Sequence, residues 1–432
     1  MKALTKISIG FLSLAAVALG FTSCSSEDVA SGTNQGKMSS LTLTINTGKS
    51  MGSRATDWTT DPAGSDKKDT ENKINRVAIG IFSNTGNVKT IVELTPGETS
   101  TTGTNTNSLT QDDANSATAK IVTSSLVNND EVLVAINAPS GKFTGCQSKS
   151  DFMAKTETAA EALANSTDAQ VADNIPMFGS ASLTGSNSSF TASVSVIHMI
   201  AKVSLASLKV DFKAGSAYAD AEFTPKAVFL INVPNSFQFD NTIDAQGDYN
   251  NAWLSAGYEH GWGAFATNYD PAAPNTDAAT TFIGSTFAKY LTTSELAVKT
   301  LKGVAGGSDA SYASDDKSVC FFYTMPNGQN DDKATKLVIA GLFTSAKAGI
   351  NNKPVYYPLF LNAKVNSAGT DYDPAVPGSV AKKVYPNKNY NCKVVIRNIG
   401  AVSPNANLDP QTATITITVK DFVSADQTTE FN

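Results

Sequence analysis

The chain has 432 residues, a formal net charge of −6, 41% hydrophobic residues and only 17% charged residues. This length allows two or three domains with cores of their own, and the acidic balance excludes the basic face that nucleic-acid binding requires. The abundance of Ser, Thr, Asn and Gly together with few charges favours β-sandwiches with polar loops over a helical fold.

The first 24 residues have the pattern of an export signal. Lys2 and Lys6 precede an apolar run over residues 7–21, which is short for a membrane span. The small residues before Cys24 resemble a bacterial lipobox, so residues 1–24 are predicted to be a lipoprotein signal that ends at a lipidated Cys24, with diacylglyceryl and palmitate as the lipid. The alternative is an ordinary signal peptide with an incidental cysteine.

Residues 25–54 are predicted to be a propeptide, a polar tether followed by a strand that can be removed. Leu41, Leu43 and Ile45 alternate with polar residues, which indicates a strand with one apolar face. The strand leads into a Gly/Ser-rich stretch that contains Arg54, the kind of exposed segment in which proteolysis concentrates.

The chain contains only three arginines. Arg76 and Arg397 lie in predicted strands, which a protease cannot thread, whereas Arg54 lies in a predicted loop. An Arg-specific protease is therefore expected to cut the folded chain once.

The body of the chain reads as two tandem β-sandwich domains, over residues 55–205 and 206–432. Residues 75–95 form a predicted hairpin, and residues 189–210 have the length of two strands placed end to end. The best helix candidate is 149–167. No repeat of 20–50 residues is evident, which disfavours solenoids and propellers.

No arrangement typical of an enzyme is found, so we predict no catalytic residues, no metal and no cofactor. His198 lies in an apolar strand, and His260 stands beside Glu259 in a loop, a weak metal signal. The acidic clusters at 329–333 and 371–374 lack the spacing of a calcium loop and are interpreted as surface turns. The three remaining cysteines are interpreted as small buried residues: Cys146, Cys320 and Cys392.

One loop segment leaves a second interpretation open. Residues 247–275 are rich in Gly and aromatic residues, of which Trp253, Tyr258, Trp262 and Phe265 could form a platform on which a sugar stacks. A surface lipoprotein that binds glycans is therefore the alternative from a different functional class. It predicts a lipid-held monomer with these aromatic side chains exposed on one face.

The last strand candidate lies at about 412–422. Its apolar face comprises Ala413, Ile415, Ile417 and Val419, and threonines occupy most of the other face. Each large aliphatic residue that becomes fully buried contributes about 1.5–3 kcal/mol. Both ends of the chain thus carry a detachable strand, and the last strand of one molecule could fill the groove left by the first strand of another. Such head-to-tail donor-strand addition produces open filaments.

At this point the chain resembles the fimbrillin family, the subunits of Bacteroides-type (type V) pili. The resemblance rests on the lipoprotein signal, the loop arginine after the first strand, and three short segments in order: "VLVAINAP", "NIPMFGS" and "HMIAKVSL". It spans nearly the whole chain. His198 departs from the pattern, because an arginine is expected before "AKV".

The resemblance implies two transthyretin-like β-sandwich domains. It also implies lipidation at Cys24, a cut between Arg54 and Ala55 by a trypsin-like surface protease, and loss of the strand that contains Leu41, Leu43 and Ile45. The donor strand of a neighbouring subunit would then enter the open groove.

We therefore expect a structural pilus subunit, most similar to a stalk fimbrillin, that supports adhesion or biofilm formation. Its partners would be other copies of itself and related subunits, and its location first the outer membrane as a lipoprotein and then the cell-surface fimbria. A pilus-tip adhesin shares the fold, but its C-terminal strand would be packed into its own domain.

Overall fold

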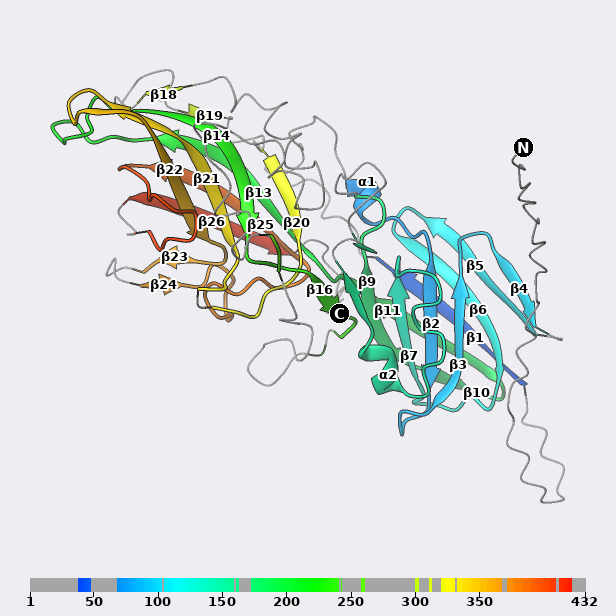
Figure 1. Ribbon diagram of the computed structural model, residues 1–432. Helices are drawn as coiled ribbons and strands as arrows, with labels where there is room; N and C mark the ends of the chain where they lie inside the picture. Colours follow the sequence, from blue (N-terminus) through cyan, green and yellow to red (C-terminus); the bar gives the residue numbers. More distant parts are fainter. Residues whose placement is uncertain are drawn as a thin grey trace, which may run out of the picture. The chain divides into compact units, whose positions relative to one another are not determined.

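The computed structural model describes residues 38–47, 68–102, 105–158, 161–162, 172–240, 242, 258–260, 300–302, 311–312, 320–330, 332–366, 371–408 and 412–421. Lys37–Asn432 belongs to one compact unit. Its described helices and strands are almost all strands (Figure 1), which confirms the predicted all-β class. In this described part no helix is long and apolar enough to cross a membrane.

The first pair of sheets contains the described strands that precede residue 200, except for the short strand at Thr156–Thr158. One sheet has the order β10-β11-β1-β6-β5-β4, and the other has the order β12-β9-β7-β2-β3. The apolar faces of the two sheets share one core of buried aliphatic side chains. The strands are β1 (Met38–Asn46), β2 (Val77–Phe82), β3 (Val88–Leu94), β4 (Thr99–Thr102), β5 (Asn105–Asp113), β6 (Ser116–Ser124), β7 (Glu131–Ile136), β9 (Met177–Ser182), β10 (Thr184–Ser186), β11 (Ser189–Ser195) and β12 (Ile197–His198).

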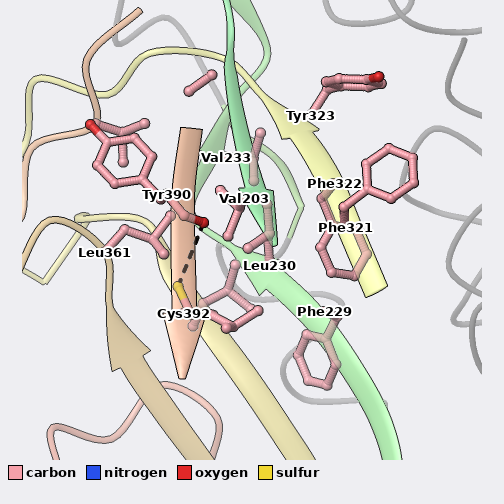
Figure 2. Close-up of a cluster of buried hydrophobic side chains, with 14 of the residues drawn as sticks. Val203, Phe229, Leu230, Val233, Phe321, Phe322, Tyr323, Leu361, Tyr390 and Cys392 are labelled. Carbon is pink, nitrogen blue, oxygen red and sulfur yellow. Dashed lines mark hydrogen bonds between the residues drawn. The ribbon is translucent and has the colours of Figure 1, made fainter. Parts of the chain in front are cut away.

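The second pair of sheets contains most of the later strands. One sheet has the order β19-β13-β25-β26 with β20 also paired to β13, and the other has the order β18-β14-β21-β22. Figure 2 shows part of its core, in which Val203, Leu230 and Tyr390 meet from three strands. The strands are β13 (Ala201–Val210), β14 (Glu222–Ile231), β18 (Leu301–Lys302), β19 (Ser311–Tyr312), β20 (Cys320–Thr324), β21 (Lys336–Ser345), β22 (Ile350–Phe360), β25 (Lys388–Ile396) and β26 (Ala413–Asp421).

Three two-stranded ribbons and two short helices complete the described elements. The ribbons pair β8 with β16, β15 with β17 and β23 with β24. Their bounds are β8 (Thr156–Thr158), β15 (Val233–Pro234), β16 (Ser236–Gln238), β17 (Tyr258–His260), β23 (Lys364–Val365) and β24 (Tyr372–Asp373), and the helices are α1 (Lys68–Glu71) and α2 (Lys149–Met153).

The helix predicted over 149–167 is interrupted after its first turn, and the described residues 161–162 are helical again. Ser148 and Asp151 form a capping box that starts α2, and the helix ends at Met153. The chain then becomes strand β8, in which Glu157 is aligned with Phe237 of β16. Non-local strand pairing therefore overrides the helical spacing of the apolar residues.

The change from one pair of sheets to the other comes earlier than the predicted boundary between residues 205 and 206. β12 ends at His198 in the first pair, and β13 begins at Ala201 in the second. β13 pairs with β20 and β25 along its length. The predicted boundary therefore falls inside one continuous strand.

In both pairs of sheets, an asparagine in a left-handed conformation directly follows a central strand. Asn137 follows β7 and Asn232 follows β14, each with a positive φ, of 62° and 58°. The amide of Asn137 donates to the carbonyls of Lys73 and Ile175. The amide of Asn232 donates in the same way to two carbonyls of the chain before β21. Asparagine tolerates this left-handed conformation, which re-aims the chain while its side chain satisfies neighbouring backbone groups.

Candidate functional site

The first strand occupies the interior of its sheet. β1 pairs in parallel with β11, from Ser40↔Ser189 to Asn46↔Ser195. On its other edge it pairs antiparallel with β6, from Met38↔Ser124 to Asn46↔Ser116. Figure 1 shows β1, the dark blue strand, between β6 and β11. We call the space between β6 and β11 the first-strand groove.

The apolar face of β1 is completely buried. Leu41, Leu43 and Ile45 are each 0% exposed, whereas Ser40 and Thr42 on the opposite face are exposed. Full burial of three such side chains contributes roughly 5–8 kcal/mol, since each contributes about 1.5–3 kcal/mol. The alternation predicted from the sequence is confirmed for this strand.

The neighbouring strands give each apolar residue of β1 its own surroundings. Leu43 stands between two small residues, Ala119 of β6 and Ala192 of β11. Ile121 and Phe190 flank Leu41, whereas Ala117 and Val194 flank Ile45. The smallest flanking side chains therefore lie at the centre of the groove, and the buried face of β1 packs into the core that the two sheets share.

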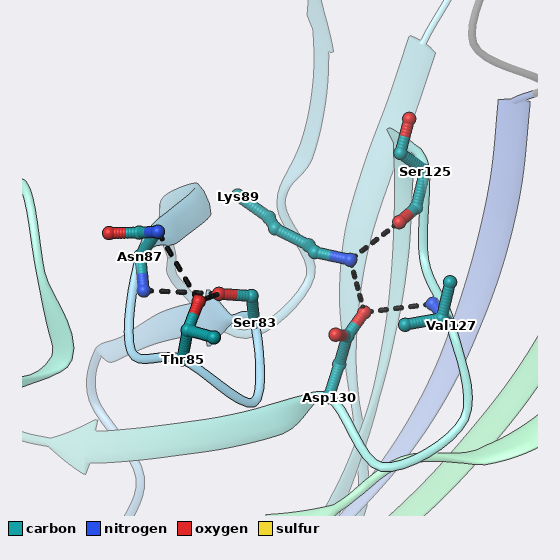
Figure 3. A network of polar contacts seen from close by, with 7 residues as sticks. All are labelled: Ser83, Thr85, Asn87, Lys89, Ser125, Val127 and Asp130. Atoms are coloured by element: carbon teal, nitrogen blue, oxygen red, sulfur yellow. Dashed lines mark hydrogen bonds and ion pairs between the residues drawn. The ribbon is translucent and has the colours of Figure 1, made fainter.

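The β6 wall of the groove is held by contacts that do not involve β1. The Nζ of Lys89 donates to Asp130 Oδ2 and to the carbonyl of Ser125, each at 2.6 Å, and the Val127 amide donates to the same carboxylate (Figure 3). This network joins β3 of one sheet to the β6–β7 turn that ends the wall. The ion pair is well shielded, because the Asp130 side chain is 0% exposed.

The β11 wall rests on the facing sheet at Gly179. A Cβ at this position in β9 would lie 2.5 Å from the carbonyl oxygen of Ser195, so the two backbones touch where only glycine fits. Neither wall therefore depends on β1 alone for its position.

The predicted processing residues lie outside the described residues. Cys24, Arg54 and Ala55 belong to this group, so lipidation and cleavage stay predictions. The described chain leaves β1 at Thr47 and resumes at Lys68. A cut at Arg54 would therefore leave β1 held only by non-covalent contacts.

The segment predicted to be the donor strand forms β26, at the edge of its sheet. It pairs antiparallel with β25 from Lys388↔Asp421 to Ile396↔Ala413. Ala413 and Ile415 are 4% and 5% exposed, and Ile417 is partly buried against the same core. The side chain of Val419 lies outside the description. A C-terminal strand that packs into its own domain, as β26 does, is the arrangement expected of a tip subunit.

The two terminal strands match residue by residue, a signal that the sequence analysis did not use. The stretch 39–46 reads Ser-Ser-Leu-Thr-Leu-Thr-Ile-Asn, and 413–420 reads Ala-Thr-Ile-Thr-Ile-Thr-Val-Lys. In both strands a small residue opens the buried face and three aliphatic residues follow at alternate positions. β26 thus carries the side-chain pattern that the first-strand groove already accommodates.

Comparisons with known proteins identify the fold. No family model and no curated protein matches the chain. A solved structure described as a "putative cell adhesion protein" from Bacteroides eggerthii DSM 20697 is 18% identical, with 90% of this chain and 97% of that chain covered and a TM-score of 0.54. Another with that description, from Parabacteroides distasonis ATCC 8503, is 13% identical, with 89% and 99% covered and a TM-score of 0.53. The chain has the fold of these two cell adhesion proteins.

A fimbrilin (FimA) from Porphyromonas gingivalis W83 is 14% identical, with 90% of this chain and 99% of that chain covered and a TM-score of 0.49.

Within the adhesion-protein fold, α1 is joined to the second pair of sheets by a buried carboxylate. Oε1 of Glu71 accepts from Lys202 Nζ at 2.7 Å and from the hydroxyl of Tyr323 at 2.6 Å. The Glu71 and Lys202 side chains are only 10% and 14% exposed. The Lys202 ammonium also lies 4.7 Å from the ring centroid of Phe321. α1 is the first described element after the predicted cleavage segment, so this carboxylate fastens the point at which the described chain resumes.

His198 packs beside this carboxylate and predicts an acid-sensitive stability. Its Nε2 lies 2.9 Å from the Glu71 carbonyl oxygen, and burial lowers its pKa from 6.5 to about 4. The unfolded chain therefore takes up this proton at a higher pH than the folded chain. The stability that this group contributes is complete above pH 6.5 and is lost as the pH falls to about 4. The expected loss is about 3 kcal/mol, since one pKa unit corresponds to about 1.4 kcal/mol.

Urea unfolding of the wild type and of His198→Gln across this pH range checks the prediction. Carboxylates titrate in both proteins, so the difference between their curves isolates the histidine. The variant should lose less stability on acidification, and parallel curves would contradict the assignment.

The remaining candidate residues form no recognisable binding site among the described residues. Trp253, Trp262 and Phe265 lie outside it, and of Tyr258–His260 only the backbone is described, as β17. No group of three or more metal-binding side chains occurs among the described residues. Cys146 and Cys392 are buried free thiols.

Proposed function

We propose that the chain is a structural subunit of a bacterial surface fimbria, a member of the fimbrillin family and most similar to a stalk subunit. It would be exported as a lipoprotein with its lipid on Cys24, cut after Arg54, and polymerised by donor-strand exchange. The cell-adhesion fold, the export signal and the loop arginine support this function.

The observation that carries the proposal is the match between β1 and β26. β1 fills an interior slot, lies at the start of the chain, and precedes the predicted cut. β26 lies at the other end and repeats its pattern of small, aliphatic and threonine residues. In the matched register Ile415 takes the place of Leu41, Ile417 that of Leu43, and Val419 that of Ile45.

The positions of the two strands also supply a driving force for exchange. In its own sheet β26 has one neighbouring strand, β25, whereas a strand in the first-strand groove has two. The transfer therefore replaces one backbone ladder by two, and each hydrogen bond gained contributes about 1 kcal/mol. A strand from another copy thereby becomes more stable in the groove than at the edge that it leaves.

Proteolysis of the purified, lipid-free precursor with a trace of Arg-specific protease tests this function. We expect a single cut that leaves Ala55 at the N-terminus, shown by intact mass and N-terminal sequencing. Unheated samples on SDS gels should then show a ladder of polymers. Arg54→Ala should abolish both the cut and the ladder, whereas Arg76→Lys, placed directly before β2, should change neither.

Truncation before Thr412 separates strand exchange from other kinds of association. The truncated chain should be cut as before but form no ladder, because the donor strand is missing. A clean cut of the full chain that leaves only monomer at every concentration would refute the stalk function.

A pilus-tip adhesin is the second candidate, favoured by the packing of β26 against β25. A tip subunit accepts a strand but donates none. In that case the cut chain would stay monomeric alone, yet a synthetic peptide of residues 412–422 would bind in its groove.

A further inference from the structure

Lys336, at the first position of β21, is a lysine buried in the second sandwich. It is 1% exposed, and its backbone is aligned with Ile231 on one side and Phe360 on the other. A buried ammonium is stable only when its donors are satisfied. The hydrogen-bond acceptors of the Lys336 ammonium lie in the turn that leads towards β26.

Three oxygen atoms of that turn accept hydrogen bonds from the ammonium group of Lys336. Lys336 Nζ lies 3.1 Å from the carbonyl of Asn405, 3.4 Å from that of Ala406, and 3.0 Å from Asn407 Oδ1. The ring of Phe360 covers it, with the centroid 4.6 Å from Nζ. We call Lys336 and residues 405–407 the Lys336 clasp.

All three acceptors are neutral, so the ammonium depends on the turn itself. No ion pair of Lys336 occurs among the described residues. If the turn moved away, the buried charge would lose all three acceptors at once, which is costly in a region of low dielectric. The clasp therefore resists movement of residues 405–407.

The clasp fastens the segment between β25 and β26 at its second half. At its first half, Ala401 and Tyr356 of β22 exchange two backbone hydrogen bonds of 2.9 Å. Beyond the clasp, the described chain resumes at Thr412, whose carbonyl accepts from the amides of Arg397 and Asn398. These last bonds belong to the β25–β26 hairpin and break when β26 leaves.

We propose that Lys336 is a positioning residue for strand exchange, which holds residues 401–407 on the second sandwich and sets the pivot of β26 directly after Asn407. This inference rests on the proposed function. The arm between the pivot and Ala413 then reaches about 20 Å when extended, at roughly 3.3–3.6 Å per residue.

The clasp also determines where tension enters the subunit. Force on a departed β26 reaches Asn407 and passes to β21, which has β14 on one side and β22 on the other. Without the clasp the same force would pass to the Ala401–Tyr356 bridge and then to the end of β25. The pivot thus protects β25 from being peeled off β13.

The charge of the clasp responds to alkaline pH. Burial lowers the pKa of Lys336 to about 8, with the Asp332 carboxylate opposing this shift and the Lys382 ammonium reinforcing it. Loss of the proton removes one donor and the charge. Because this pKa is lower than that of a lysine in the unfolded chain, loss of the proton relieves the cost of the buried charge, and the folded state gains stability as the pH rises through about 8.

Hydrogen exchange of the uncut, full-length chain tests the pivot without any need for polymers. Ile415→Asp with Ile417→Asp places two charges on the apolar face of β26 and unseats it. We expect residues 413–421 to lose protection while the amides of 401–407 stay within about threefold of the parent. Adding Lys336→Met should accelerate exchange in 401–407 by about ten- to a hundredfold, since hydrogen bonds from a charged donor are lost.

Two further variants keep this result specific. Lys336→Arg retains the charge and donors and should restore most of the protection, whereas Lys353→Met, at an exposed position of β22, should change nothing.

Exchange of 401–407 together with 413–421 in chains that retain Lys336 would overturn the pivot. Equal exchange in Lys336→Met and Lys353→Met would overturn it as well. Failure of the proposed function appears elsewhere, as the absence of polymers after cleavage at Arg54, so the two failures are distinguishable.

Discussion

Leu43→Asp should unfold the first sandwich of the uncut precursor. Leu43 is 0% exposed at the centre of the first-strand groove, between Ala119 and Ala192. A carboxylate at this position has no cation near it among the described residues. The substitution also removes the contribution of a buried leucine. The expected loss is about 4–5 kcal/mol or more, which is a large part of the stability of an ordinary domain. Urea unfolding followed by circular dichroism measures it.

Two control variants show whether the loss of stability comes from a charge inside the groove or from any change in β1. Thr42→Asp puts the same charge on the exposed face of β1 and should cost less than about 1 kcal/mol. Giving β1 the aliphatic residues of β26, Leu41→Ile, Leu43→Ile and Ile45→Val, should leave the precursor folded, at less than about 1.5 kcal/mol for each change. Unfolding of this triple variant would argue against β26 as an occupant of the groove.

Glu71→Ala should cost about 3–5 kcal/mol, because it leaves the Lys202 ammonium buried without its carboxylate. The Tyr323 hydroxyl loses its acceptor in the same step. Thermal or urea unfolding gives the value. The stability of Glu71→Gln should lie between that of the wild type and that of Glu71→Ala, since the amide oxygen still accepts a hydrogen bond but carries no charge.

The chain offers a matched ion pair for comparison. Glu222 and Lys302 also form a glutamate–lysine ion pair, at 2.9 Å, but their side chains are 39% and 58% exposed. Glu222→Ala should therefore cost less than about 1 kcal/mol. Equal effects of the two alanine variants would show that Glu71 contributes no more than a surface charge.

Local patterns were sufficient to predict individual strands. The alternation of Leu41, Leu43 and Ile45 predicts β1 and its buried face, and the hairpin signal in 75–95 corresponds to β2 and β3. Each of these depends on side chains that lie a few residues apart. The apolar face of β26 was read from 412–422 in the same way.

Sheet order could not be derived, because it depends on contacts between distant segments. Nothing in the local pattern of β1 indicates that β11, about 150 residues later, becomes its parallel neighbour. The helix predicted over 149–167 is interrupted for the same reason, since Glu157 pairs with Phe237 of β16 in a strand. The Lys336 clasp joins three turn residues to a strand far earlier in the chain, and no spacing reveals it.

The interior position of β1 explains how a single cut can act on it. Before the cut, β1 is part of the same chain as its groove and binds at an effective concentration of about a millimolar. A cut at Arg54 would change none of its hydrogen bonds and none of its buried side chains. It would only turn an intramolecular ligand into a free peptide, and dilution to about a micromolar would weaken its occupancy by roughly 4 kcal/mol. Proteolysis would thus start assembly by dilution, and the groove would pass to whichever strand is most concentrated around it.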